Sequence, residues 1–430
     1  MTTSFTSLFL DCLILAAVQF AAALPWLWAL DSRGFRRWIK SPTVLAYAVG
    51  TILGTGLALA WFVSERRITT VLQDYGRYFG CILHAQLVLD SMIVAPRLLL
   101  LVWPKGGAIA LATFRECWRQ PMFWLIAVLA AIAIAASMVI PYFTFGDDYK
   151  MMKQLGFDFI MLSAALFGLL AASISINEEI EGRTAITVMS KPVSRRQFLL
   201  GKYVGTLFAC WAMMMILGWI LTWALYIKPH FDKLDDVNDT MPTEVVQLLT
   251  PSLSKVEPNG EPISFPKQLV RRVMSFGSST PEVRSFAEGN AMWVGETLAL
   301  HVGILLTFGQ VMVLLAICVA LATRMPFVIN LVICLFVFMI GHLAPVLVQV
   351  TAQMTQDSAA IKLVGFIAQL LNALFPALEY FDMGPAIIRD SSVPMWSFSV
   401  YVASVFGYAV LYSAIGMILG LILFEDRDLA

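Results

Sequence analysis

The residues best suited to specific chemistry are concentrated in one charged stretch, residues 177–203, between two long apolar segments. Only 13% of the chain is charged, yet this stretch carries three glutamates and five Lys or Arg residues. Exposed charges of both signs fix the choice of a partner and its register more than its affinity. The stretch is therefore predicted to be a docking surface for another protein. The alternative, that its charges only anchor two membrane spans, accounts for the cations but not for the glutamates.

The same stretch does not contain a phosphate-binding loop. Such a loop needs a glycine, four further residues, and then Gly-Lys-Ser or Gly-Lys-Thr, so that backbone amides can hold the phosphates. Here Gly201-Lys202 is followed by Tyr203, and the residue five positions before Gly201 is Arg196. The chain is therefore not expected to bind ATP by this route, and no catalytic residue or cofactor is predicted in it.

Ionisable residues inside apolar segments offer a second candidate site. Such residues are rare within membrane spans and often functional. Asp90, His301 and His342 are therefore predicted to form an intramembrane polar site. There is a simpler interpretation for each type of residue. Each histidine could be neutral and hydrogen-bonded to a neighbouring helix, and Asp90 could pair with His84 or Arg97. Only Arg97, two helical turns away, would share a face with Asp90.

No metal site is predicted. The four histidines are far apart, and no pair of them has the spacing that places two ligands on one helical face. The six cysteines are scattered without a CxxC pair and are interpreted as buried thiols. Three consecutive methionines, residues 213–215, would point in different directions around a helix, which favours packing over metal binding.

Membrane spans must position these groups. The chain is 59% hydrophobic, with a mean hydropathy of +0.78, and carries no net charge. These values predict an integral membrane protein and give no reason to expect nucleic-acid binding. The first 20 residues lack the basic start of a secretory signal, and their apolar stretch is longer than a signal needs, so they are expected to remain as a span.

Nine spans are predicted from apolar segments of about 20 residues, the length that crosses a bilayer as a helix. The third of them is energetically marginal, because Asp90 and Arg97 lie inside it. The nine segments are residues 5–30, 42–63, 79–103, 122–144, 157–176, 203–227, 298–322, 325–350 and 397–424.

The distribution of Lys and Arg predicts the orientation. With nine spans, one side holds 14 Lys and Arg residues in its short loops and the other holds 7. The more basic side is cytoplasmic, so the N-terminus is predicted outside and the C-terminus in the cytoplasm. Residues 228–297 are a large outer loop left out of this comparison. Residues 363–378 are predicted to be a re-entrant or interfacial helix, because a tenth span would place the C-terminus outside.

Local signals divide the charged stretch into two helices. Glutamates 178, 179 and 181 suit the first turn of a short helix, where the dipole favours negative charge, and Lys191-Pro192 ends it. Ser194 and Gln197 form a capping box for the following helix. Its residues Arg195, Arg196 and Lys202 are predicted to anchor that helix at headgroup level.

A second interfacial helix is predicted just before the span that starts at residue 122. Phe114 and Trp118 share one face, opposite Arg115 and Arg119. Pro121 marks a bend. This arrangement is typical of a helix that lies in the interface and leads into the membrane.

Two motifs resemble those of the permease subunits of type-2 ABC exporters, in particular a bacterial branch labelled as involved in multi-copper enzyme maturation. They are Glu179-Ile-Glu-Gly-Arg-Thr and Met189-Ser-Lys-Pro-Val-Ser-Arg-Arg-Gln-Phe-Leu-Leu-Gly-Lys. Arg183 departs from the family pattern, which has Gly-Thr there. The resemblance implies an all-α polytopic membrane protein, with a six-span core at 106–430 after a three-span extension at 1–105.

The resemblance also implies a mechanism and partners. Two permeases would pair, as a homodimer or a heterodimer in the lipid bilayer of the cell inner membrane. Each would contact an ATP-binding cassette subunit, which would bind the ATP and Mg, through the cytoplasmic coupling loop at residues 177–203. The implied docking residues are Glu178, Glu179, Glu181, Gly182, Arg183, Thr184, Lys191, Pro192, Arg195 and Arg196. The alternatives are a membrane scaffold or assembly factor with the same fold, and an intramembrane enzyme that uses Asp90 and His84.

Overall fold

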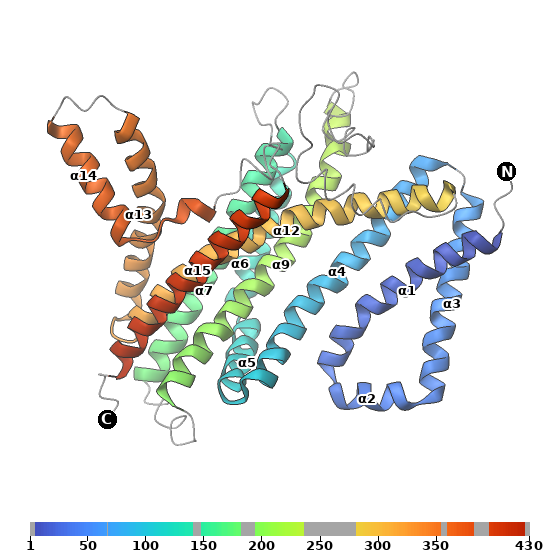
Figure 1. Cartoon of the computed structure of the whole chain (residues 1–430), viewed down its shortest axis with the longest axis horizontal. Coiled ribbons are helices and arrows are strands. Elements are labelled where there is room, and N and C mark those ends of the chain that lie inside the picture. The colour runs from blue at the N-terminus through green and yellow to red at the C-terminus, as the bar shows by residue number, and fades with distance from the viewer. Residues whose placement is uncertain are drawn as a thin grey trace.

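The computed structural model describes residues 5–66, 68–140, 148–181, 194–235, 281–353, 359–381 and 395–425. All the regular secondary structure in these ranges is helical, and Figure 1 shows long helices side by side. The helices are α1 (Phe5–Leu30), α2 (Ser32–Lys40), α3 (Pro42–Glu65), α4 (Thr69–Val102), α5 (Pro104–Arg119), α6 (Pro121–Ser137), α7 (Asp148–Glu181), α9 (Arg195–Asp235), α12 (Pro281–Ala322), α13 (Phe327–Gln353), α14 (Ala359–Leu374), η1 (Leu378–Phe381) and α15 (Met395–Glu425).

The helices agree with the predicted number of spans. Within the described ranges, eight helices are long and apolar enough to cross a membrane, and α5 with α6 makes a ninth when the pair is counted as one broken span. The axes of α5 and α6 differ by 61° at the break before Pro121, where the bend was predicted. The protein is therefore an all-α, multi-pass membrane protein.

Three helices form the interior of the bundle. Between 61% and 72% of the most apolar stretches of α7, α9 and α12 is buried, compared with 11% to 28% for α1, α3, α4, α13 and α15. Met213, Met214 and Met215 of α9 are all buried although they point in different directions. A helix that is apolar all round is covered on every side. These methionines therefore pack in the core, as predicted.

Several helices are longer than the predicted spans. α9 continues to Asp235 and α12 begins at Pro281, so the loop predicted over residues 228–297 is helical at both ends. Residues 236–280 lie outside the described part of the chain. α4 begins at Thr69, ten residues earlier than predicted. The added turns of α12 and α4 pack against each other. This packing stabilises turns that would not form a stable helix in isolation.

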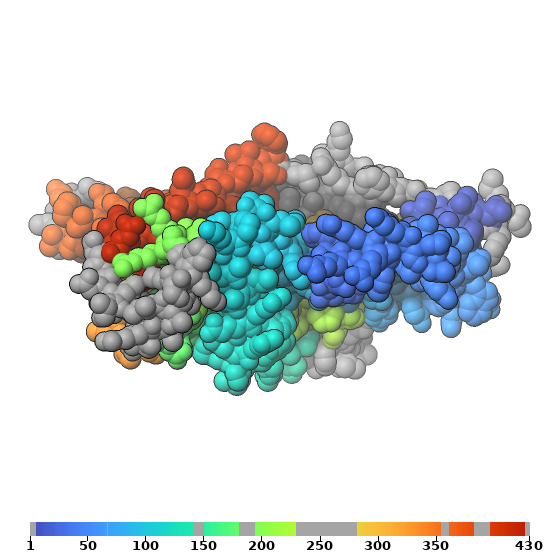
Figure 2. All heavy atoms as spheres, turned by 90° about the horizontal axis from the view of Figure 1, so that it is seen from below, coloured from blue at the N-terminus to red at the C-terminus, as the bar shows by residue number. Residues whose placement is uncertain are grey.

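This α4–α12 contact joins the N-terminal helices to the rest of the bundle. A methyl group added at Gly289 of α12 would collide with the backbone of Gln73, and one added at Gly76 of α4 would collide with the backbone of Phe286. Glycines thus allow the two helices to approach backbone to backbone, as is common in membrane interfaces. Helices α1 to α3 lie beyond α4, and α13 and α14 lie at the opposite end of the molecule (Figures 1 and 2).

Helix α14 pairs with α13 as a hairpin (Figure 1). Its 16 residues include an apolar stretch of only 14, Ile361–Leu374, shorter than the roughly 20 residues that a span requires. Leu363, Phe366 and Leu370 are exposed along it. These features fit the prediction that this segment does not cross the membrane.

Candidate functional site

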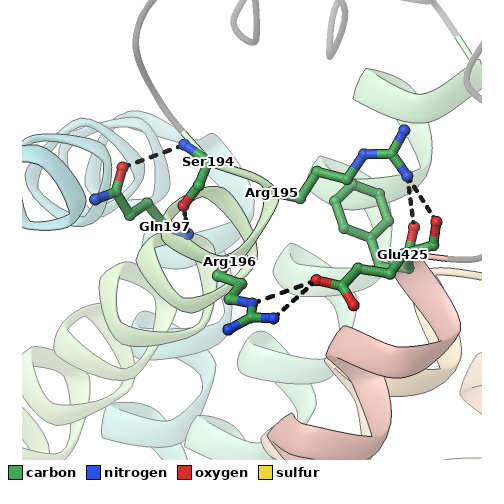
Figure 3. Close-up of polar contacts among 6 residues, drawn as sticks. Ser194, Arg195, Arg196, Gln197 and Glu425 are labelled. Carbon is green, nitrogen blue, oxygen red and sulfur yellow. Dashed lines mark hydrogen bonds and ion pairs between the residues drawn. The ribbon is translucent and has the colours of Figure 1, made fainter.

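The start of α9 is built as the sequence predicts. The backbone N–H of Gln197 donates to Oγ of Ser194, and the backbone N–H of Ser194 donates to Oε1 of Gln197, both at 3.2 Å (Figure 3). This reciprocal pair is a capping box, which satisfies N–H groups that have no partner inside the helix. It fixes where the chain enters α9 after residues 182–193.

Two arginines at this position bind the end of α15 (Figure 3). Nη1 of Arg195 donates to the backbone carbonyls of Phe424 and Glu425, at 3.2 and 2.9 Å. The guanidinium of Arg196 contacts the carboxylate of Glu425 at 3.2 Å. A cation is favourable at a helix C-terminus because it satisfies carbonyls and opposes the dipole. We name this set the α9–α15 contact; the predicted role of Arg195 and Arg196 as headgroup anchors stays a prediction.

The turn between α12 and α13 reaches the same helix end. Nε of Arg324 donates to the carbonyl of Leu423 at 2.8 Å. The last carbonyls of α15 therefore receive guanidinium donors from both the start of α9 and the end of α12. Three helices are held together at one end of the bundle.

Lys202 joins α9 to two further helices. Only 5% of this residue is exposed, so it is buried rather than a headgroup anchor as predicted. Its Nζ donates to Oγ of Ser175 at 2.7 Å, forms an ion pair with Glu179, and lies 3.6 Å from Oε2 of Glu116 on α5. A buried ammonium needs such partners to offset its loss of hydration. Lys202 and Glu179 are thus part of the packing between α5, α7 and α9.

The glutamates do not begin a new helix. α7 runs without a break through Glu181, so all three lie in the last turns of α7 and the predicted first-turn position is wrong. α7 continues because Ile176 is packed in a cluster with Phe198 and Phe424, and because Lys202 offsets the charge of Glu179 at the negative end of the dipole. Glu178 is exposed at this end.

The other predicted docking residues fall on a part of the chain that the structure does not describe. They are Gly182, Arg183, Thr184, Lys191 and Pro192.

Asp90, His301 and His342 lie in three different surroundings. His301 of α12 contacts His84 of α4, with 3.3 Å between their Nε2 atoms, and His342 of α13 contacts Gln310 of α12 at 2.9 Å. Oδ1 of Asp90 is buried without a hydrogen-bond partner, and no ion pair joins Asp90 to Arg97 in the described ranges. The predicted intramembrane site is therefore divided into separate places.

The two histidines form a ring of hydrogen bonds with Thr297. Nδ1 of His301 donates to the carbonyl of Thr297 at 2.8 Å, so in a neutral ring its Nε2 accepts from Nε2 of His84. Nδ1 of His84 then accepts from the hydroxyl of Thr297 at 3.5 Å. Each ring nitrogen has a partner without a charge, which matches the interpretation of a neutral histidine bonded to a neighbouring helix. The sequence carried no signal for this pair, because its members are 217 residues apart.

His342 lines a cavity of about 120 Å³ between α7, α12, α13 and η1, and the lining is both polar and apolar. Its polar lining comes from Gln154 and Asp158 of α7, Thr307 and Gln310 of α12, and His342 of α13. Several hydrogen-bonding side chains thus converge inside a membrane bundle, where polar groups are costly unless they serve a function. The cavity suits the polar part of a small molecule.

No group of three or more His, Cys, Asp or Glu residues is placed to hold a metal ion in the ranges that the structure describes. The six cysteines are buried as free thiols, in agreement with the sequence interpretation.

Comparison with known proteins relates one part of the chain to a transporter family. Residues 116–252 match the family model described as ABC-2 family transporter protein. The match begins in α5 and includes α6, α7 and α9, together with the charged stretch between α7 and α9. The chain has no match among curated proteins. The family match supports an ABC-2 type permease; it does not extend to the branch labelled for multi-copper enzyme maturation.

Proposed function

We propose that this chain is the membrane-spanning subunit of an ATP-driven exporter, in which a separate ATP-binding cassette subunit hydrolyses the ATP. The family match of residues 116–252 supports a permease, and the lack of a phosphate-binding loop in the sequence agrees with nucleotide chemistry in another chain. ATP and Mg would be bound by that partner.

The single observation that carries the proposal is how the two ends of segment 182–193 are held. On the α7 side, Glu179 pairs with Lys202, which also contacts Glu116 of α5. On the α9 side, Arg195 and Arg196 bind the end of α15. A displacement of this segment would therefore act on α5, α7, α9 and α15 together, because the residues at each of its ends contact a second or third helix. Such connections would let a movement imposed by an external ATPase reach several spans at once.

The predicted docking residues then divide into two roles. Glu178 is exposed and Glu181 directly precedes segment 182–193, so we assign these two, with Gly182, Arg183, Thr184, Lys191 and Pro192, to direct contact with the ATPase. Glu179, Arg195 and Arg196 are engaged within the chain and position that surface.

We assign the docking surface and the C-terminus to the cytoplasm and the N-terminus to the outer side of the cell inner membrane, on the basis of the Lys and Arg distribution. Two permeases would pair in the bilayer. The cavity beside His342 would receive the polar part of the exported molecule.

The test compares two charge reversals in the complete complex. Glu178→Lys with Glu181→Lys should lower substrate-stimulated ATP hydrolysis by at least about tenfold. This is a change of about 1.4 kcal/mol, which lies below the several kcal/mol that like charges cost at an interface. Glu65→Lys, a single exposed charge reversal at the end of α3, is the control and should leave hydrolysis unchanged.

Two results would contradict the proposal. One is that the chain, purified in mild detergent, carries no ATPase and that no phosphate-loop protein from the same cells binds to it. The other is full ATP hydrolysis in the docking variant. An ATPase that binds but responds to no transported molecule would favour the scaffold alternative.

A further inference from the structure

A groove separates the last part of α4 from α5. Its volume is about 370 Å³, within the range of about 300–1,000 Å³ that is typical of small-molecule sites. The residues that line it are Leu89, Met92 and Ile93 of α4 and Phe114, Arg115, Trp118 and Arg119 of α5. We call it the α4–α5 groove.

One side of the groove is apolar and aromatic. Leu89, Met92 and Ile93 present aliphatic side chains from α4, and Phe114 and Trp118 face them from α5. A surface of this kind excludes water and favours a hydrocarbon chain. Leu89 is exposed, so an apolar ligand can reach this side of the groove from outside the protein.

The other side carries two guanidinium groups. Arg115 and Arg119 are one helical turn apart and exposed, and within the described ranges neither has a hydrogen bond or an ion pair. Arg195, Arg196 and Arg324 differ from them, because each binds the end of α15. Two neighbouring guanidinium groups without a partner match the geometry of a phosphate group, which accepts paired N–H donors.

The bend between α5 and α6 lies next to the groove, because Trp118 lines the groove and Trp124 follows the bend. α5 meets α6 at 61°, and Trp118 and Trp124 lie at the bend, where Nε1 of Trp124 donates to the carbonyl of Trp118 at 3.1 Å. Tryptophan is enriched at the boundary between headgroups and acyl chains. In the view from below, the surface that contains α5, coloured cyan, faces the viewer (Figure 2).

We propose that the α4–α5 groove binds one anionic phospholipid. The phosphate contacts Arg115 and Arg119, and an acyl chain lies along Leu89, Met92 and Ile93. Two cations with no carboxylate in the lining favour a net negative headgroup over a zwitterionic one. Because α4 supplies the aliphatic residues of the groove, the site depends on a helix that precedes the family-matched region, and this gives α4 a role in lipid recognition.

The experiment measures lipid binding to the purified full-length chain. Native mass spectrometry would follow phosphatidylglycerol and phosphatidylcholine titrated into the detergent-solubilised protein. Arg115→Gln with Arg119→Gln should weaken phosphatidylglycerol binding by about thirtyfold, as expected for the loss of two basic residues near a headgroup. The control is Arg36→Gln with Arg37→Gln on α2, which removes the same charge from exposed positions outside the groove and should leave binding unchanged.

A second variant tests the apolar side without changing charge. Ile93→Trp fills the groove and should also abolish binding of phosphatidylglycerol. Thermal unfolding shows whether this variant remains folded. Unchanged binding in Ile93→Trp would overturn the proposal.

Three other results would also overturn it. Equal loss in the α2 control would mean non-specific attraction to surface charge. Equal binding of phosphatidylcholine would mean that the guanidinium groups do not select the headgroup. Displacement of the lipid by inorganic phosphate at millimolar concentration would identify a site for the free anion instead of a lipid.

Discussion

Lys202 of α9 and Glu179 of α7 form an ion pair at the point where these helices meet α5. The ammonium side chain is 6% exposed and the carboxylate side chain 25%, so the pair is shielded from water on most sides. It connects the ends of the two helices between which the ATPase is proposed to dock. Part of the charged stretch is thus a structural contact between helices, next to the residues that are proposed to dock the ATPase.

Lys202→Met should destabilise the protein by about 2–3 kcal/mol. The substitution removes the buried cation that pairs with Glu179; the estimate is below the usual cost of breaking a buried pair because Glu179 is a quarter exposed. Thermal unfolding in detergent measures the effect. Adding Glu179→Gln should recover part of the loss, and a Lys202→Met protein as stable as the parent would contradict this prediction.

Arg195→Gln should destabilise the α9–α15 contact more than Arg196→Gln does. Arg195 donates two hydrogen bonds to carbonyls at the end of α15, and its loss is expected to cost about 1–2 kcal/mol. The Arg196–Glu425 pair is 69% and 50% exposed, so its loss should cost less than about 1 kcal/mol. Hydrogen exchange of the last turns of α15 measures both, and the reverse order would show that this assignment is wrong.

Gly289→Ala should disrupt the contact between α4 and α12. The added methyl group would collide with the backbone of Gln73, which cannot move aside as a flexible side chain could. Overpacking of this kind costs about 1–3 kcal/mol. Gly54→Ala on α3 is the matched control, because nothing lies within 4 Å of the added methyl group. It should be neutral or slightly stabilising, since alanine favours a helix.

Equal unfolding temperatures for Gly289→Ala and Gly54→Ala would mean that α4 and α12 do not approach backbone to backbone.

His84→Leu should destabilise the chain by about 1–3 kcal/mol. It leaves Nε2 of His301 and the hydroxyl of Thr297 without their partner in a buried position. Exchanging both histidines for leucine should cost less than the sum of the two single changes, because both polar partners are then removed together. A double-mutant cycle on thermal unfolding checks this, and strict additivity would exclude the hydrogen bond between the two rings.

The sequence predicted the features that depend on residues close together in the chain. The number of spans follows from the lengths of apolar segments, because the cost of transfer into a bilayer is a property of each segment. The capping box of Ser194 and Gln197 and the bend at Pro121 depend on a few adjacent residues, and both were predicted correctly.

Features that depend on distant residues were missed or misinterpreted. Lys202 was predicted at headgroup level because nothing in its neighbourhood shows that Glu116 and Glu179 come from other helices to surround it. α7 was predicted to end before the glutamates, since the apolar residues that extend it, such as Phe424, are contributed by α15.

The sequence by itself thus determined the nine apolar segments of a membrane protein and the position of the charged stretch, because hydropathy and charge are local properties of the chain. Only the tertiary structure decided which charged side chains pair with other residues of the protein and which remain exposed. It paired His84 with His301, tied Arg195 to the end of α15, and left Arg115 and Arg119 beside an apolar groove. These contacts join residues far apart in the chain, and only the packing of helices brings them together.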